Sequence, residues 1–227
     1  MRTEKKPAAA DQRQQPLTNS KETLRESQAS LYLGSLTRII AACTETIDPS
    51  VTALDSKYAL STVSLIGMPG VGKSTVGVIL AKLLGLDFLD TDLSIQAREQ
   101  RSLQEILDSD GYLRLRDIEE RVLLEVPIEM RVVATGGSVV YSDAAMQRLK
   151  RSGTVIYLAA DIQTLKDRVA TNPERGIASA AGLTFEDIYA ERTPKYEHYA
   201  DYSVTATNQN ADEVAQTIGK ILLAQND

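Results

Sequence analysis

Residues 67–74 read GMPGVGKS, which fits the phosphate-binding pattern G-x-x-x-x-G-K-[ST]. The β-branched, apolar run at residues 62–66 precedes this stretch, and residues 74–84 follow it with apolar side chains at helical spacing. Strand, glycine loop and helix are the setting in which such a loop holds phosphate groups. The pattern therefore predicts a nucleoside triphosphate site, and the alternative is a tight glycine turn that binds nothing.

The loop assigns a separate role to each of its groups. The backbone N–H groups that would surround a phosphate belong to Gly70, Val71, Gly72 and Lys73. The dipole of the following helix adds positive potential at the same place. The Lys73 ammonium would reach the terminal phosphate oxygens, and the Ser74 hydroxyl would ligate Mg²⁺. Thr75 continues the motif, and we count it among the nucleotide-binding residues.

Composition limits the classes of function. The chain has 227 residues, 43% of them hydrophobic, a net charge of −6 and a sequence pI near 5.0, which argues against a large nucleic-acid footprint. No apolar run approaches the length of a membrane span. Cys43 is the only cysteine and His198 the only histidine, so a Cys/His zinc site is excluded and a reducing, cytoplasmic location is expected.

The amino-terminal part differs from the rest. Residues 1–30 are polar and are predicted to be a disordered tail, and their acidic residues argue against an organelle-targeting peptide. Residues 31–60 carry apolar side chains at helical spacing and are predicted to be a helical extension. We expect a monomer, although this extension could contact another subunit. Residues 61–227 form the predicted main domain.

In the main domain, strand-like runs alternate with helix-like runs. This alternation predicts an α/β fold of three layers, with a parallel sheet between helices. Ligands of such sheets bind at the carboxyl ends of the strands. The phosphate loop, Asp90, Asp92 and the pair Gly136–Gly137 all fall at such ends. We therefore expect these four features to form one site.

Charged residues near the predicted strand ends are candidates for the chemistry. Asp90 and Asp92 are two residues apart, so one carboxylate could help hold Mg²⁺ and the other could accept a hydrogen bond from an attacking hydroxyl. The alternative is that the aspartate before Leu93 caps a helix. Arg116 stands on a charged helix, for which a solvated face is the alternative. Arg175, in a glycine-containing loop, suits a lid over a triphosphate, and an ordinary surface loop is its alternative.

From about Val63 to Leu222 the chain resembles shikimate kinase. The resemblance is carried by motifs in a fixed order: GMPGVGKST, FLDTD, LRDIE, ATGG, a lid arginine and ERTPKYEHYAD. It implies the nucleoside-monophosphate-kinase type of fold, with a five-stranded parallel sheet and a lid. It also implies transfer of the γ-phosphate of ATP to the 3-hydroxyl of shikimate, with Mg²⁺ as cofactor and an anionic hydroxy acid as the small-molecule partner.

The resemblance also implies residue roles. Asp92 would bind the substrate hydroxyls and act as base, and Arg116 and Arg192 would grip the substrate carboxylate. Asp90 would lie near Mg²⁺. The resemblance further implies that Gly137, with Gly136 beside it, contacts the substrate. Arg168 would contact the adenine, and Arg175, the catalytic lid residue, would contact the transferred phosphate. Lys73, Asp92 and Arg175 are thus the candidate catalytic residues.

The chain departs from the family pattern at three places. Ser138, directly after Gly137, stands where the family usually has a third consecutive glycine. Gly176 replaces a proline after the lid arginine, and Tyr112 replaces a glutamate after Gly111. Two alternatives stay open beside shikimate phosphorylation. One is a kinase of a related small hydroxy acid, and the other is a non-catalytic nucleotide-binding relative.

Overall fold

The computed structural model describes residues 62–170, 177–180 and 182–224. The predictions for residues 1–60 and for Arg175 and Gly176 lie outside these residues. Within them the chain alternates strands and helices, as the sequence pattern predicts. No helix in this part of the chain has the length and apolar character needed to cross a bilayer.

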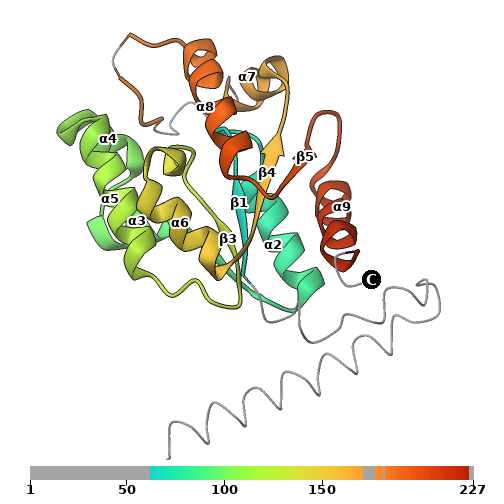
Figure 1. The fold of residues 1–227 in the computed structure, drawn as a ribbon. Helices are drawn as coiled ribbons and strands as arrows, with labels where there is room; N and C mark the ends of the chain where they lie inside the picture. Colours follow the sequence, from blue (N-terminus) through green and yellow to red (C-terminus); the bar gives the residue numbers. More distant parts are fainter. Residues whose placement is uncertain (1–61, 171–176, 181, 225–227) are drawn as a thin grey trace, which may run out of the picture. The chain divides into compact units, whose positions relative to one another are not determined.

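The centre of the fold is a five-stranded sheet in which every pair of neighbouring strands is parallel (Figure 1). The order is β2-β3-β1-β4-β5, so β1 lies in the middle. All of its residues are buried, which matches its apolar, β-branched sequence. The strands are β1 (Thr62–Ile66), β2 (Asp87–Asp90), β3 (Arg131–Ala134), β4 (Gly153–Ala159) and β5 (Tyr202–Thr205).

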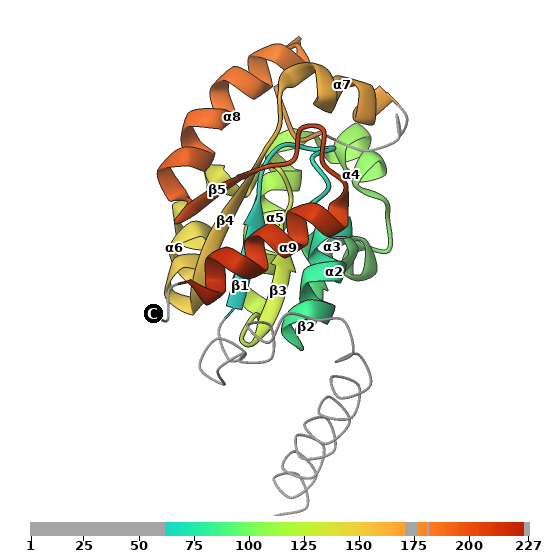
Figure 2. The same cartoon turned by 90° about the vertical axis from the view of Figure 1, so that its right-hand side faces the viewer.

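Helices cover both faces of the sheet. On one side α2 (Lys73–Leu84) packs against α9 (Ala211–Leu223), and on the other α5 (Tyr112–Glu125) packs against α6 (Asp143–Ser152) (Figures 1 and 2). The two short helices α3 (Thr91–Glu99) and α4 (Leu103–Asp110) pack against α5. This arrangement confirms the predicted three-layer αβα class.

The carboxyl ends of the strands carry two more helices. Figure 2 shows α7 (Ile162–Ala170) and α8 (Phe185–Tyr199) at this end of the sheet. The short 3₁₀ helix η2 (Val139–Tyr141) follows β3 and packs against α5, α6 and α8. Arg192 and Tyr196 are one helical turn apart on α8, and both are buried at this end. The fold thus brings α5, η2 and α8 together beside the phosphate loop.

Helix caps fix where the elements begin. A capping box formed by Ser102 and Glu105 opens α4, and a second one, formed by Thr184 and Asp187, opens α8. The cap of α3 is Asp90, whose carboxylate accepts hydrogen bonds from the backbone N–H groups of Asp92 and Leu93. Asp92 therefore lies in the first turn of α3, two residues after the cap.

Candidate active site

The loop between β1 and α2 wraps around the Lys73 ammonium. Lys73 is 3% exposed, and its Nζ donates to the backbone oxygens of Gly67 at 2.8 Å and Met68 at 3.0 Å. Gly72 has a φ of 104°, a left-handed conformation that side-chain-bearing residues rarely adopt, although a Cβ there would meet nothing within 4 Å. The glycine is thus required by backbone geometry, and the loop has the shape that its sequence predicts.

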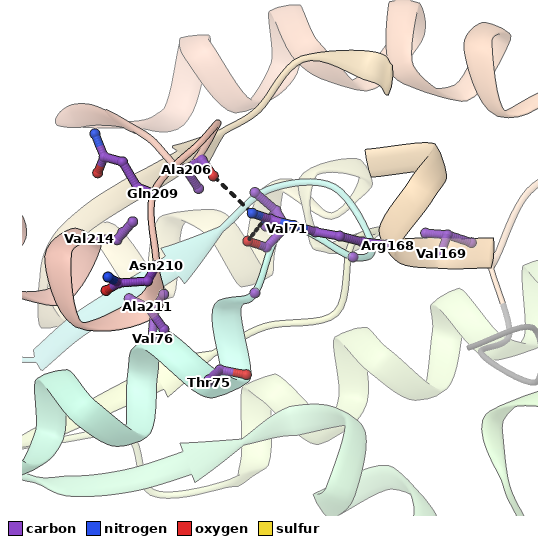
Figure 3. A pocket seen from close by; sticks show the side chains of 12 residues that line it. Val71, Thr75, Val76, Arg168, Val169, Ala206, Gln209, Asn210, Ala211 and Val214 are labelled. Carbon is purple, nitrogen blue, oxygen red and sulfur yellow. Dashed lines mark hydrogen bonds between the residues drawn. The ribbon is translucent and has the colours of Figure 1, made fainter. Parts of the chain in front are cut away.

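A pocket lies on one side of this loop, against α7 and α9 (Figure 3). Arg168 anchors one wall, because its guanidinium donates to the backbone oxygens of Val71 at 3.2 Å and Ala206 at 3.1 Å. Five residues predicted to bind the nucleotide line this pocket together: Gly70, Val71, Gly72, Thr75 and Arg168. The opposite wall comes from the connection between β5 and α9, with Ala206, Gln209 and Asn210, and from the start of α9, with Ala211 and Val214.

The residues present fit a Mg²⁺ ion that is shared with phosphate groups. The described part of the chain contains no cluster of three or more acidic, histidine or cysteine side chains that would hold a metal by itself. Mg²⁺ in phosphoryl-transfer enzymes is usually bound by one or two protein oxygens together with phosphates and waters. Ser74, at the start of α2, and Asp90, at the end of β2, are the residues that would supply these oxygens. One oxygen of Asp90 already caps α3.

A second pocket lies on the other side of the loop. Its lining joins Pro69 of the loop with Asp92 of α3, Glu119 of α5 and Arg192 of α8, and it is completed by Leu103, Gly137, Ser138, Ile177 and Ala178. The loop and the turn after β3 touch here, since a Cβ on Gly137 would come within 2.9 Å of the Pro69 ring. The two pockets are therefore lined by adjacent residues of the loop, Gly70 for the first and Pro69 for the second.

Two arginines converge at this second pocket. Arg116 Nη2 donates to the backbone oxygen of Ala178 at 3.2 Å, and Arg192 Nη2 donates to the same oxygen at 2.6 Å. Arg192 is 1% exposed, and the Arg116 Nε is buried without a hydrogen-bond partner. The ion pairs of the described residues include neither arginine. A buried and a half-buried guanidinium that share one carbonyl oxygen are well placed to bind a carboxylate.

Gly136 leaves room for two carboxylates. A Cβ at this position would lie 2.4 Å from Glu119 Oε1 and 3.1 Å from Asp92 Oδ1. The Gly136 backbone N–H donates to the Thr91 hydroxyl at 3.0 Å, which fixes the turn after β3. The next side chain, Ser138, is buried and donates its hydroxyl to Glu119. Ser138, which replaces the usual glycine, therefore lines the pocket, and its hydroxyl is held by the acidic Glu119.

Glu119 carries a shifted pKa. The pKa is raised from 4.5 to about 7, mainly by burial of the carboxylate and in part by the charge of Asp92, while the Ser138 hydroxyl and the two arginines oppose the rise. The whole residue keeps some exposed surface, but the carboxylate itself is enclosed by α3, α5 and the turn after β3. Near neutral pH both protonation states of this carboxyl group are therefore populated.

This shift predicts a pH-dependent stability. Between pH 4.5 and about 7 the folded protein holds a proton that the unfolded chain has released, so stability should fall as the pH rises through this window. The fall has an upper limit of about 3 kcal/mol at about 1.4 kcal/mol per pKa unit. Glu119→Gln should remove it, as measured by urea unfolding at about pH 5 and about pH 7.5. Glu120→Gln, at the exposed neighbour, is the control and should keep the fall.

The structure gathers the predicted residues into two neighbouring sets. The nucleotide set lies on one side of the loop, and Asp92, Gly136, Gly137 and both arginines lie on the other. Sequence reasoning missed the β5–α9 connection, although its place after the last strand was a usable signal. It also missed Tyr141, whose ring centroid lies 3.6 Å from Arg116 Cζ, and Ala178. His198, the only histidine of the sequence, is exposed on α8.

Comparison with known proteins agrees with this geometry. Residues 69–223 match the family model described as shikimate kinase. The chain is 34% identical over 164 residues to a shikimate kinase of Thermodesulfovibrio yellowstonii, covering 71% of this chain and 94% of the relative. It is 37% identical over 168 residues to shikimate kinase 2 of Yersinia enterocolitica, covering 71% of this chain and 95% of the relative.

Solved structures give the same result. The fold matches a shikimate kinase of Acinetobacter baumannii in complex with shikimate, with a TM-score of 0.69, 30% identity and coverage of 78% of this chain and 98% of that one. It also matches the enzyme of Aquifex aeolicus, with a TM-score of 0.61, 28% identity and coverage of 72% and 96%. The family model, the curated relatives and the solved structures thus agree on one family of ATP-dependent kinases. The chain belongs to the shikimate kinase family.

Proposed function

We propose that the chain transfers the γ-phosphate of ATP to the 3-hydroxyl of shikimate, giving shikimate 3-phosphate and ADP. The observation that carries this proposal is the convergence of Arg116 and Arg192 on a single oxygen, that of Ala178. This carbonyl occupies the place where a carboxylate oxygen of the acceptor would bind. Two charge-assisted hydrogen bonds to a carboxylate contribute about 1.5–3 kcal/mol each.

The neighbouring groups suit phosphoryl transfer. Asp92 lies in the same pocket as Arg192 and next to the loop, so its carboxylate can accept the proton of the attacking hydroxyl. The Lys73 ammonium supplies positive charge at the phosphate loop, and the backbone N–H groups of the loop orient the transferred group. Mg²⁺, when bound with the nucleotide at Ser74 and Asp90, would neutralise phosphate charge. The roles of Arg168 towards the adenine and of Arg175 as the lid arginine remain part of the proposal.

The further properties rest on sequence. A cytoplasmic location fits the single cysteine, and no nucleic-acid or membrane partner is expected from the acidic composition. We propose a monomeric enzyme in which residues 31–60 are available for a contact with another subunit.

A release assay for ADP tests the reaction. We expect ADP production with shikimate, and little with no acceptor or with the methyl ester of shikimate, because the ester lacks the charge that the two arginines bind. The phosphorylated product should appear in a one-to-one ratio with ADP. Shikimate-independent ADP release, or equal turnover of the ester, would contradict the proposal.

One observation favours a second candidate, a kinase of a related hydroxy acid. Ser138 places a hydroxyl in the acceptor pocket, where it is held by Glu119. Other ring hydroxy acids, such as quinate, therefore belong in the same assay. Turnover of such an acid without turnover of shikimate would favour this candidate, and Ser138→Gly should then shift the preference back towards shikimate.

A further inference from the structure

Tyr141 is the aromatic residue at the centre of the arginine pair. It is the last residue of η2, and its ring centroid lies 3.6 Å from Arg116 Cζ. The Nε of Arg192 donates to the Tyr141 hydroxyl at 3.4 Å, and Arg192 Cζ lies 5.3 Å from the ring centroid. A third cation, Lys195 Nζ, lies 5.6 Å from the same centroid. One side chain thus contacts both arginines of the acceptor pocket.

The Tyr141 ring offsets part of the electrostatic repulsion between the two arginines. Arg116 and Arg192 hold like charges close together, and the single carbonyl oxygen that they share carries only a partial negative charge. The negative face of an aromatic ring attracts a guanidinium stacked on it. Tyr112 also faces Arg116, but its ring centroid is farther away, at 5.1 Å, and among the described residues Arg116 is the one cation that it contacts. Tyr141 is therefore the stronger aromatic partner of Arg116 and a partner of Arg192 as well.

The backbone holds Tyr141 in a fixed place. Its N–H donates to the Ser138 oxygen at 3.0 Å, and the N–H of the next residue, Ser142, donates to the Val139 oxygen at 3.0 Å. The Ser142 side chain then caps α6 by accepting from the Ala145 N–H. The turn after β3 and the start of α6 thus fix the backbone from which the Tyr141 ring projects, without a contribution from the arginines.

We propose that Tyr141 is a positioning residue for recognition of the acceptor carboxylate. Its ring face holds the Arg116 guanidinium, and its hydroxyl holds Arg192, so both cations are in place before the acceptor arrives. A binding site that is already ordered loses less conformational entropy when its ligand binds. The inference rests on the proposed function, because it assumes that the ligand of these arginines is a carboxylate.

The two contacts can be separated by substitution. Tyr141→Phe keeps the ring and removes the hydroxyl, so we expect a rise of about two- to threefold in the acceptor KM, since the lost hydrogen bond is long. Tyr141→Leu removes both contacts, and we expect about a tenfold rise in the acceptor KM and in the acceptor Kd measured calorimetrically without ATP. The KM for ATP, and kcat at saturating acceptor, should stay within about twofold in both variants.

A matched control separates positioning from general stability. Tyr189 is a partly buried tyrosine on α8, one helical turn before Arg192, whose hydroxyl donates to the Ala160 backbone oxygen and to neither arginine. Tyr189→Leu makes the same truncation, so it should lower the melting temperature without changing the ratio of acceptor KM to ATP KM. If Tyr141→Leu behaves in this same way, Tyr141 is structural only and the proposal is overturned.

A second measurement does not depend on the acceptor. In a crystal structure of Tyr141→Leu without ligands, we expect the Arg116 guanidinium to leave the Ala178 oxygen, and an unchanged Arg116 would overturn the proposal. The proposed function fails separately, when the unsubstituted protein does not phosphorylate shikimate. The kinetic comparison of the Tyr141 variants is then made with the hydroxy acid that the unsubstituted protein does phosphorylate.

Discussion

Lys73→Met is expected to lower kcat for phosphoryl transfer by about a thousandfold, because it removes the cation at the phosphate loop that would stabilise charge on the transferred group. Methionine has a similar length and fits an apolar environment. It cannot donate to the backbone oxygens of Gly67 and Met68 as Lys73 does. Some loss of stability should therefore accompany the loss of rate. A coupled assay of ADP release at saturating substrates measures kcat.

The matched control for this variant is Lys82→Met, an exposed position in the last turn of the same helix. It should retain kcat within about twofold, since Lys82 lies more than two helical turns from the loop. Melting curves and circular dichroism of both variants show whether the fold persists. A folded Lys73→Met protein that keeps near-normal kcat would contradict the assignment of the loop.

Arg116→Ala is expected to raise the KM for shikimate by about 10- to 150-fold, which corresponds to the loss of about 1.5–3 kcal/mol of charge-assisted hydrogen bonding. The KM for ATP should change little, because Arg116 lies on the acceptor side of the loop. For Arg116→Lys the KM for shikimate should lie between those of the unsubstituted protein and of Arg116→Ala, since an ammonium keeps the charge but lacks the planar fork of a guanidinium. Steady-state kinetics with each substrate varied in turn gives both constants.

Arg114→Ala provides the comparison. Arg114 is two residues away on α5 and is exposed, so its removal should leave the acceptor KM within about twofold. If Arg116→Ala and Arg114→Ala have the same small effect, Arg116 belongs to a solvated charged face. That was the alternative considered from the sequence, and the acceptor site would then need another anion-binding group.

Much of the fold could be predicted from the sequence because each element carries a local signal. The glycine motif needs a strand before it and a helix after it, and β1 and α2 are found there. The capping box of Ser102 and Glu105 marks the start of α4, because each of these side chains binds the backbone N–H of the other residue. Sheet order had no such local signal, because strand neighbours are set by packing between distant segments.

The candidate site was predictable where one residue type defines the chemistry. Lys73 and Arg192 could be named from motifs, and both are buried at the expected end of the sheet. The Ala178 oxygen could not be found, since every residue has a backbone carbonyl and its place depends on tertiary structure. The role of Asp90 as the cap of α3 was also missed, because either aspartate in the Asp90–Asp92 pair could have capped this helix.

The pH behaviour could not be predicted at all from the sequence. Glu119 is an ordinary helix residue in the linear pattern, and its pKa of about 7 arises from burial beside Asp92 and Gly136 in the folded protein. The role of Tyr141 could not be predicted either, because its contacts with Arg116 and Arg192 depend on three elements, η2, α5 and α8, that are distant in the chain.

The central claim is that the phosphate loop and a carboxylate-binding pocket meet closely enough for direct transfer. A crystal structure with ADP, Mg²⁺ and shikimate bound tests it most directly. We predict that the shikimate carboxylate replaces the Ala178 oxygen on Arg116 and Arg192, with the 3-hydroxyl within hydrogen-bonding distance of Asp92 and turned towards Lys73. A carboxylate bound elsewhere, with Arg116 and Arg192 still on the Ala178 oxygen, would contradict the account.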